Sequence, residues 1–257
     1  MVSDRIHAMR GVHWLLLFAL ILGAWTILYL MALPADLRRA GVVYGADFLQ
    51  SLCVVTPDAA GFLRICLMWG LMSAAMMVPT ALPAIATYDD LSQSGQADKM
   101  ATKMAHLVAG YLVVWLGFSV LAAAVQLGLF QLDLISSFGD SRSGFLSAGL
   151  LAIAGAYQFS NAKEACLSKC RRPLVFFMQY WDEGAWRNGL RLGLVCLGCC
   201  WALMLLAFVG GVMNIAFMGL ATVIMVLEKL PDIGRWLTRP LGVVLLGAAG
   251  WVFVNSL

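Results

Sequence analysis

The stretch that decides the fold is GLRLGLVCLGCCWALMLLAFV, residues 189–209, in which Arg191 is the only charged residue. A helix that crosses the hydrocarbon core of a bilayer needs about 20 consecutive, predominantly apolar residues. Lipid offers no partners for backbone N–H and C=O groups, so such a stretch closes its hydrogen bonds only as a helix. Residues 189–209 therefore predict a membrane-spanning helix.

Similar apolar stretches occur along the whole chain. Of the 257 residues, 62% are hydrophobic and 12% are charged, whereas a soluble domain is about half apolar and about a quarter charged. We expect a single all-α transmembrane domain over residues 1–257, a polytopic bundle of about seven helices. The run from residue 144 is short, and we expect its helix to continue past the membrane surface. The expected spans are about 14–33, 62–86, 105–132, 144–161, 189–209, 212–228 and 240–257.

The charged residues indicate orientation. A net charge of +3, spread over helix ends, excludes a nucleic-acid partner. Of the 17 lysines and arginines, 13 fall on one side of the expected spans, and the others are Arg38, Arg39, Arg64 and Arg142. Because basic loops stay on the cytoplasmic side, the pattern predicts a multi-pass protein of the bacterial inner membrane, surrounded by lipid, with a cytoplasmic N-terminus.

Three cysteines lie close together in the 189–209 span. Cys196, Cys199 and Cys200 are spaced i, i+3, i+4, and Met204 follows one turn later, so one helix face carries all four sulfurs. A buried thiol ionises only beside a cation or a metal. We interpret this face as a set of soft-metal ligands, with plain apolar packing as the alternative.

Methionines form a second sulfur stripe. Met68, Met72 and Met76 are spaced i, i+4, i+8 in the 62–86 span, just before Pro79, which frees a backbone carbonyl. Thioethers are soft ligands that suit Cu(I), whereas catalytic zinc and haem sites lean on histidine, of which the chain has 3. Methionine as filler of apolar helices is the alternative interpretation.

The 212–228 span carries a third stripe, which includes Asn214, Met218 and Glu228. A polar amide within a membrane helix is costly unless it is paired, so we expect Asn214 to face protein or a cavity. We interpret Lys229, next to Glu228, as a charge that reaches the membrane surface from the helix end.

Between two spans, Cys166 and Cys170 are spaced i, i+4 and share a helix face if a helix runs on to Pro173. Nearby basic residues, Lys163 and Lys169 among them, are predicted to lower the pKa of both thiols. Such thiols suit metal capture or redox exchange, and ordinary reduced cysteines are the alternative.

Taken together, these motifs resemble a bacterial family of predicted metal-binding integral membrane proteins, a domain of unknown function. The resemblance covers residues 68–229 and implies metal binding, but no reaction. It rests on Met68-Trp69, Met72, Ala75-Met76-Met77, Pro79, Tyr157-Gln158, Lys163, Cys166-Leu167, Cys170-Arg171, Pro173, Gly193, Cys196, Gly198-Cys199-Cys200-Trp201, Met204, Gly211, Met213-Asn214, Met218 and Glu228-Lys229.

Three functions fit these observations. The first is a non-enzymatic membrane protein that binds a soft metal, with copper as the implied ion, and transports it or delivers it to a metal-carrier protein. The second is a subunit or assembly factor that binds a partner membrane protein through a surface of small residues. The third is a thiol oxidoreductase. The small residues are Gly242, Gly247, Ala248, Ala249 and Gly250.

Overall fold

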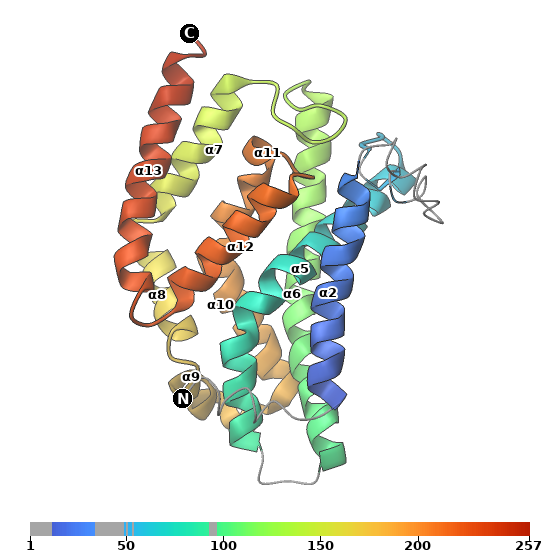
Figure 1. Ribbon diagram of the computed structural model, residues 1–257, viewed down its shortest axis with the longest axis vertical. Coiled ribbons are helices and arrows are strands. Elements are labelled where there is room, and N and C mark those ends of the chain that lie inside the picture. Colours follow the sequence, from blue (N-terminus) through green and yellow to red (C-terminus); the bar gives the residue numbers. More distant parts are fainter. Residues whose placement is uncertain (1–11, 34–48, 50, 53, 93–96) are drawn as a thin grey trace.

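The computed structural model in Figure 1 describes residues 12–33, 49, 51–52, 54–92 and 97–257. Predicted features at the N-terminus and at Arg38 and Arg39 lie outside these residues. Within them the chain is built of helices, and a short 3-10 turn (Trp181–Glu183) precedes α10. The helices are α2 (Val12–Ala32), α5 (Ala59–Ser92), α6 (Ala97–Gln131), α7 (Gly144–Tyr157), α8 (Asn161–Cys170), α9 (Pro173–Tyr180), α10 (Gly184–Leu205), α11 (Ala207–Gly210), α12 (Ile215–Lys229) and α13 (Gly234–Val254).

Five helical stretches are long and apolar enough to cross a membrane: 12–32, 59–92, 100–131, 173–210 and 234–254. The predicted spans at 144–161 and 212–228 correspond to shorter helices, α7 with 14 residues and α12 with 15. The all-helical class is thus confirmed for the described residues, and five of their helical stretches have the length and apolar composition of spanning helices, while the crossings themselves and their number stay a prediction.

The helix from residue 144 does not continue as expected. α7 ends at Tyr157, and the chain starts a new helix, α8, at Asn161. The Ser160 hydroxyl accepts the N–H of Lys163 and caps the new helix. The Tyr157 hydroxyl donates to the Gly198 carbonyl at 2.5 Å, which ties the end of α7 to the middle of α10.

The helices run alternately up and down the bundle. In Figure 1, α2, α6, α10 and α13 rise, whereas α5, α7 with α8, and α12 descend. The start of α2 and the end of α13 consequently lie at opposite ends of the molecule. The helix ends that carry basic residues, at the starts of α6, α10 and α13, all point the same way, as the charge count predicts.

Pro79 fixes the contact between α2 and α5. Proline has no backbone N–H, so the carbonyl four residues earlier, that of Ala75, loses its helical partner. The indole of Trp25 in α2 donates to this carbonyl at 2.8 Å. The freed carbonyl predicted from the sequence is therefore satisfied by a neighbouring helix, as buried backbone groups in a membrane must be.

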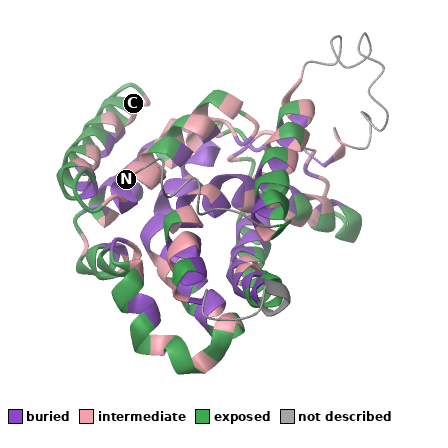
Figure 2. Cartoon of the chain, turned by 60° about the horizontal axis from the view of Figure 1, so that its bottom comes forward, coloured by how far each residue is buried: buried purple, intermediate pink, exposed green. Residues whose placement is uncertain are grey.

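The sulfur stripes face the interior of the bundle. Figure 2 shows buried residues gathered in the centre and exposed residues on the outer faces of the helices. The predicted methionine ligands are all at most 3% exposed; they are Met68, Met72, Met76, Met204 and Met218. The exposed outer positions of the helices are instead filled by residues such as Leu16, Leu121 and Val244.

The small-residue surface of α13 is divided between two environments. A side chain at Gly242 would meet the Phe159 ring, and Ala249 is buried, so this half packs against the end of α7. Gly247 and Gly250 have open space beside them. Of these small residues, Gly247 and Gly250 therefore remain accessible to a partner helix.

Candidate metal centre

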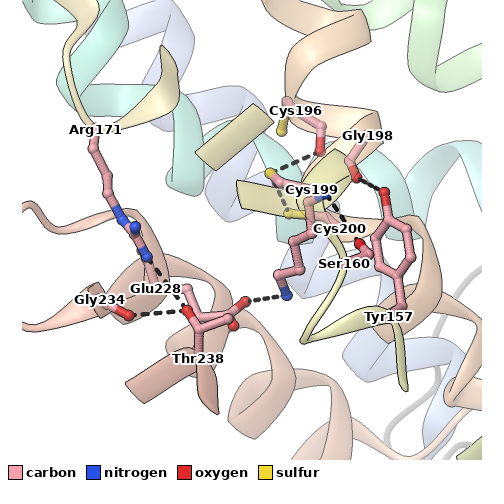
Figure 3. Close-up of polar contacts among 11 residues, drawn as sticks. Tyr157, Ser160, Arg171, Cys196, Gly198, Cys199, Cys200, Glu228, Gly234 and Thr238 are labelled. Carbon is pink, nitrogen blue, oxygen red and sulfur yellow. Dashed lines mark hydrogen bonds and ion pairs between the residues drawn. The ribbon is translucent and has the colours of Figure 1, made fainter. Parts of the chain in front are cut away.

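The three cysteines of α10 form one buried cluster. Cys196, Cys199 and Cys200 are each 1% exposed, and their sulfurs all lie within 4.8 Å of one another. Cys199 donates to the Cys196 carbonyl at 3.1 Å, and its sulfur lies 3.2 Å from that of Cys200 (Figure 3). The i, i+3, i+4 spacing thus places the three thiols together, and the neighbouring pair approaches more closely than their angular separation on the helix suggests.

This spacing is suitable for a shared ion. Two sulfurs that bind one metal at about 2.3 Å each lie at most about 4.6 Å apart, and the sulfurs here lie within 4.8 Å of one another. Small side-chain rotations would close the difference. Among the described residues, these three cysteines are the set of at least three His, Cys, Asp or Glu side chains that lie close enough together to bind one ion.

Lys229 supplies a cation to the cluster. Its ammonium donates to the sulfur of Cys196 at 2.9 Å and to the hydroxyl of Thr80 at 2.6 Å, and the residue is 8% exposed. The prediction that Lys229 reaches the membrane surface is therefore wrong. A signal was present in the sequence, because Lys229 lies four residues after Met225 and shares the inward face of α12 with Met218.

Other polar groups surround Cys196. The Tyr111 hydroxyl of α6 lies 3.1 Å from the Cys196 sulfur and donates to the Met77 carbonyl at 2.9 Å. Thr80 donates to the same carbonyl. A cavity of about 20 Å³ borders these groups, enough for about one water molecule. No sequence pattern indicates Tyr111, because its position depends on how α6 packs against α5 and α10.

The thiols of α8 lie beside this cluster. A side-chain carbon added at Gly198 would come 2.5 Å from the Cys166 sulfur, so α8 lies directly on α10 at that point. Cys170 lines the same cavity as Cys196 and neighbours Cys199. The described cysteines are all free thiols. Two thiols of α8 and three of α10 therefore meet at one helix contact.

The predicted effect of basic residues on the α8 thiols is wrong for Cys166. Burial raises the pKa of its thiol above the ordinary value, and the nearby charge of Lys169 offsets only part of this. Two other nearby cations are engaged elsewhere. Lys163 forms a buried ion pair with Glu228 at 2.8 Å, and Arg171 donates to the Glu228 carbonyl at 2.9 Å.

Figure 3 places this charge cluster next to the cysteines. Lys163 and Glu228 are each 1% exposed, and one carboxylate oxygen of Glu228 has no hydrogen-bond partner among the described residues. Arg171 also contacts Glu164 at 3.2 Å and Thr238 at 3.3 Å. Glu228 therefore joins α8 to α12, and its side chain points to Lys163 rather than to the sulfurs.

Asn214 does not face the interior. Its side chain accepts the N–H of Phe217 at 3.1 Å and donates to the Gly210 carbonyl at 3.0 Å, and the residue is exposed. It is the N-cap of α12. The expectation of a buried amide is wrong because the helix begins one residue later, where a capping side chain satisfies its free N–H groups.

A model of one protein family, described as PpoB2: Copper chaperone, matches residues 66–252. The matched stretch runs from within α5 to within α13 and contains all the predicted thiol and thioether ligands. No curated protein and no solved structure matches the chain.

Proposed function

The chain belongs to the PpoB2 copper-chaperone family, and from that premise we propose that it is an inner-membrane protein that binds Cu(I) through Cys196, Cys199 and Cys200 and transports or delivers it. The observation that carries the proposal is the cluster of three buried sulfurs within 4.8 Å of one another. The proposed orientation, with a cytoplasmic N-terminus, rests on the positive charges that gather at one end of the bundle.

The charges around the cluster favour a monovalent ion. An isolated charge in an apolar interior is costly, so a buried site is most stable when its total charge is near zero. The ammonium of Lys229 contributes one positive charge beside Cys196. One Cu(I) ion, two thiolates and one neutral thiol then give a neutral site.

Coordination number separates copper from zinc. A Zn²⁺ ion with three thiolates and Lys229 would also be neutral, but structural zinc is almost always held by four ligands. The described cluster offers three thiols. Soft sulfur ligands with no histidine among them suit Cu(I).

The remaining sulfurs suggest a route for the ion. Cys166 and Cys170 lie against the α10 cluster, so we propose that they receive Cu(I) from it or pass Cu(I) to it on the cytoplasmic side. Thioethers bind Cu(I) without adding charge, so the buried methionines suit transient binding deeper in the bundle. The proposed thioether ligands are Met68, Met72, Met76, Met204 and Met218.

Copper content tests this proposal. The purified protein is loaded with Cu(I) under reducing conditions, washed with a weak chelator and measured by elemental analysis beside a Cys196→Ser/Cys199→Ser/Cys200→Ser variant. We expect about one copper per chain, lost in the triple variant. Cys66→Ser, which removes a thiol of α5 outside the cluster, is the matched control and should keep its copper.

Equal copper in the triple variant and the wild type would overturn the cysteine site. Absence of copper from both would favour the second function, binding of a partner membrane protein. The specific observation behind that alternative is the open space beside Gly247 and Gly250 on α13, where another helix could approach closely.

A further inference from the structure

A cleft of about 870 Å³ lies away from the cysteines, between the α7–α8 junction and the start of α13. One wall is formed by residues 158–161 with Glu164, and the other by residues 235–236 and 238–240. Both walls belong to loops and helix ends that the charge distribution predicts to lie at the cytoplasmic membrane boundary. Nothing in the proposed copper chemistry uses this cleft.

Gln158 in the cleft wall has an unusual side chain. The residue is 4% exposed, and among the described residues neither its amide nitrogen nor its amide oxygen has a hydrogen-bond partner. A buried amide without partners is costly, so such groups in native structures require an explanation. A bound oxyanion would supply an acceptor for the two amide N–H donors.

The charges around Gln158 favour an anion. Arg235 and Arg239 both line the cleft, and in the part of the chain that the structure describes neither guanidinium has an ion-pair partner. Glu164 also lines the cleft, but its carboxylate is paired with Arg171 at 3.2 Å. The N-terminal turn of α8, which favours anions, opens beside them.

The rim of the cleft is aromatic and exposed. Trp236 is 83% exposed and Phe159 is 49% exposed. Tryptophan is enriched at the level of lipid headgroups, and basic pockets between helices on the cytoplasmic side bind anionic headgroups. We propose that this cleft binds the phosphate of an anionic phospholipid, with Arg235 and Arg239 as its charge partners and Gln158 as a neutral donor.

Lipid retention tests this site. The full-length protein is stripped of lipid in detergent and titrated with short-chain phosphatidylglycerol, with phosphatidylcholine as the uncharged comparison, and bound lipid is counted by native mass spectrometry. We expect one tightly held phosphatidylglycerol per chain. Arg235→Ala/Arg239→Ala should bind it about 25-fold more weakly, from roughly fivefold for each cation.

Two further variants isolate the cleft. Lys103→Ala/Arg187→Ala removes two exposed cations from the starts of α6 and α10 and should leave phosphatidylglycerol binding unchanged. Gln158→Leu keeps all charges and should weaken binding about tenfold, as expected for a lost hydrogen bond to a charged group. Copper content, measured on the same samples, should be unchanged in all these variants.

Three outcomes would overturn the assignment. One is equal binding of phosphatidylglycerol by the wild type and the Arg235→Ala/Arg239→Ala variant. Another is equal retention of phosphatidylcholine. The third is displacement of the lipid by inorganic phosphate that binds the cleft as tightly as phosphatidylglycerol does, which would assign the cleft to a free anion instead.

Discussion

Compared with the two thiols of α8, the three thiols of α10 lie deeper in the bundle and beside a cation. Cys196 accepts from the ammonium of Lys229, whereas Cys166 is half-buried and burial raises the pKa of its thiol. More basic residues surround Cys166 in the sequence than surround Cys196. The electrostatic environment of each thiol therefore depends on which cations point toward its sulfur, and not on how many lie nearby in the sequence.

Two of the cations near the α8 thiols, Lys163 and Arg171, are engaged by carboxylates and a carbonyl. The Glu228 carboxylate forms an ion pair with Lys163, and the Glu228 carbonyl accepts a hydrogen bond from Arg171. A second guanidinium nitrogen of Arg171 pairs with the Glu164 carboxylate. On α12 the next residue, Lys229, points the other way, toward Cys196. Of these two neighbouring residues of α12, Glu228 thus holds α8 in place, and Lys229 brings a positive charge to the α10 cysteines.

The largest expected effect comes from breaking the buried ion pair. Glu228→Gln leaves the Lys163 ammonium buried without a carboxylate, and removal of one partner from such a pair costs about 3–5 kcal/mol. We expect the free energy of unfolding in detergent micelles to fall by this amount. The double variant Lys163→Met/Glu228→Leu, which removes both charges, should recover most of the loss.

A surface ion pair provides the control for this change. Glu183 pairs with Arg191 at 2.7 Å, but their side chains are 29% and 43% exposed. Glu183→Gln should therefore cost less than about 1 kcal/mol. If Glu228→Gln proved equally mild, the Lys163–Glu228 pair would not be what holds α8 against α12.

The next effect concerns copper affinity. Lys229→Leu removes the cation beside Cys196 without adding a sulfur ligand, and loss of a group that orients a metal ligand typically costs 10–100-fold in affinity. We expect a fall of this size in a Cu(I) competition titration against a chelator. Lys169→Leu, which removes an exposed lysine of α8, should change the affinity little.

An affinity that rises in Lys229→Leu would contradict this charge balance. It would indicate that Lys229 competes with copper for Cys196 instead of balancing the thiolates. The thiols of α10 and α8 would then differ only in how deeply they are buried, and not in whether a neighbouring cation favours copper binding.

Much of this arrangement could be predicted from local spacing. Hydropathy located the long apolar helices, and the i, i+3, i+4 pattern placed the sulfurs of Cys196, Cys199 and Cys200 on one face. Pro79 predicted a free carbonyl, which Trp25 satisfies. These features depend on one helix at a time, and helical geometry fixes them.

The errors concern the ends of helices and the contacts between them. α7 ends at Tyr157 and Ser160 caps a new helix, α8, where the sequence suggested one continuous helix. Lys229 shares the inward face of α12 with Met218 and Met225, but this spacing alone does not say which way its long side chain extends at the helix end. The packing of α12 against α5 and α10 brings its ammonium to Cys196.

The smallest expected effect is on the reactivity of Cys166. Because its thiol pKa is raised, a smaller fraction is thiolate at neutral pH, and the thiolate is the reactive form. Alkylation, followed at this site by peptide mass spectrometry, should be slower than for a free cysteine and should accelerate as the pH rises beyond the ordinary cysteine range. Lys169→Met should slow it a further two- to fivefold, roughly, since an exposed charge acts weakly through water. Alkylation of Cys166 faster than that of a free cysteine at neutral pH would mean that the basic residues of α8 activate it after all, and the contrast with α10 would be lost.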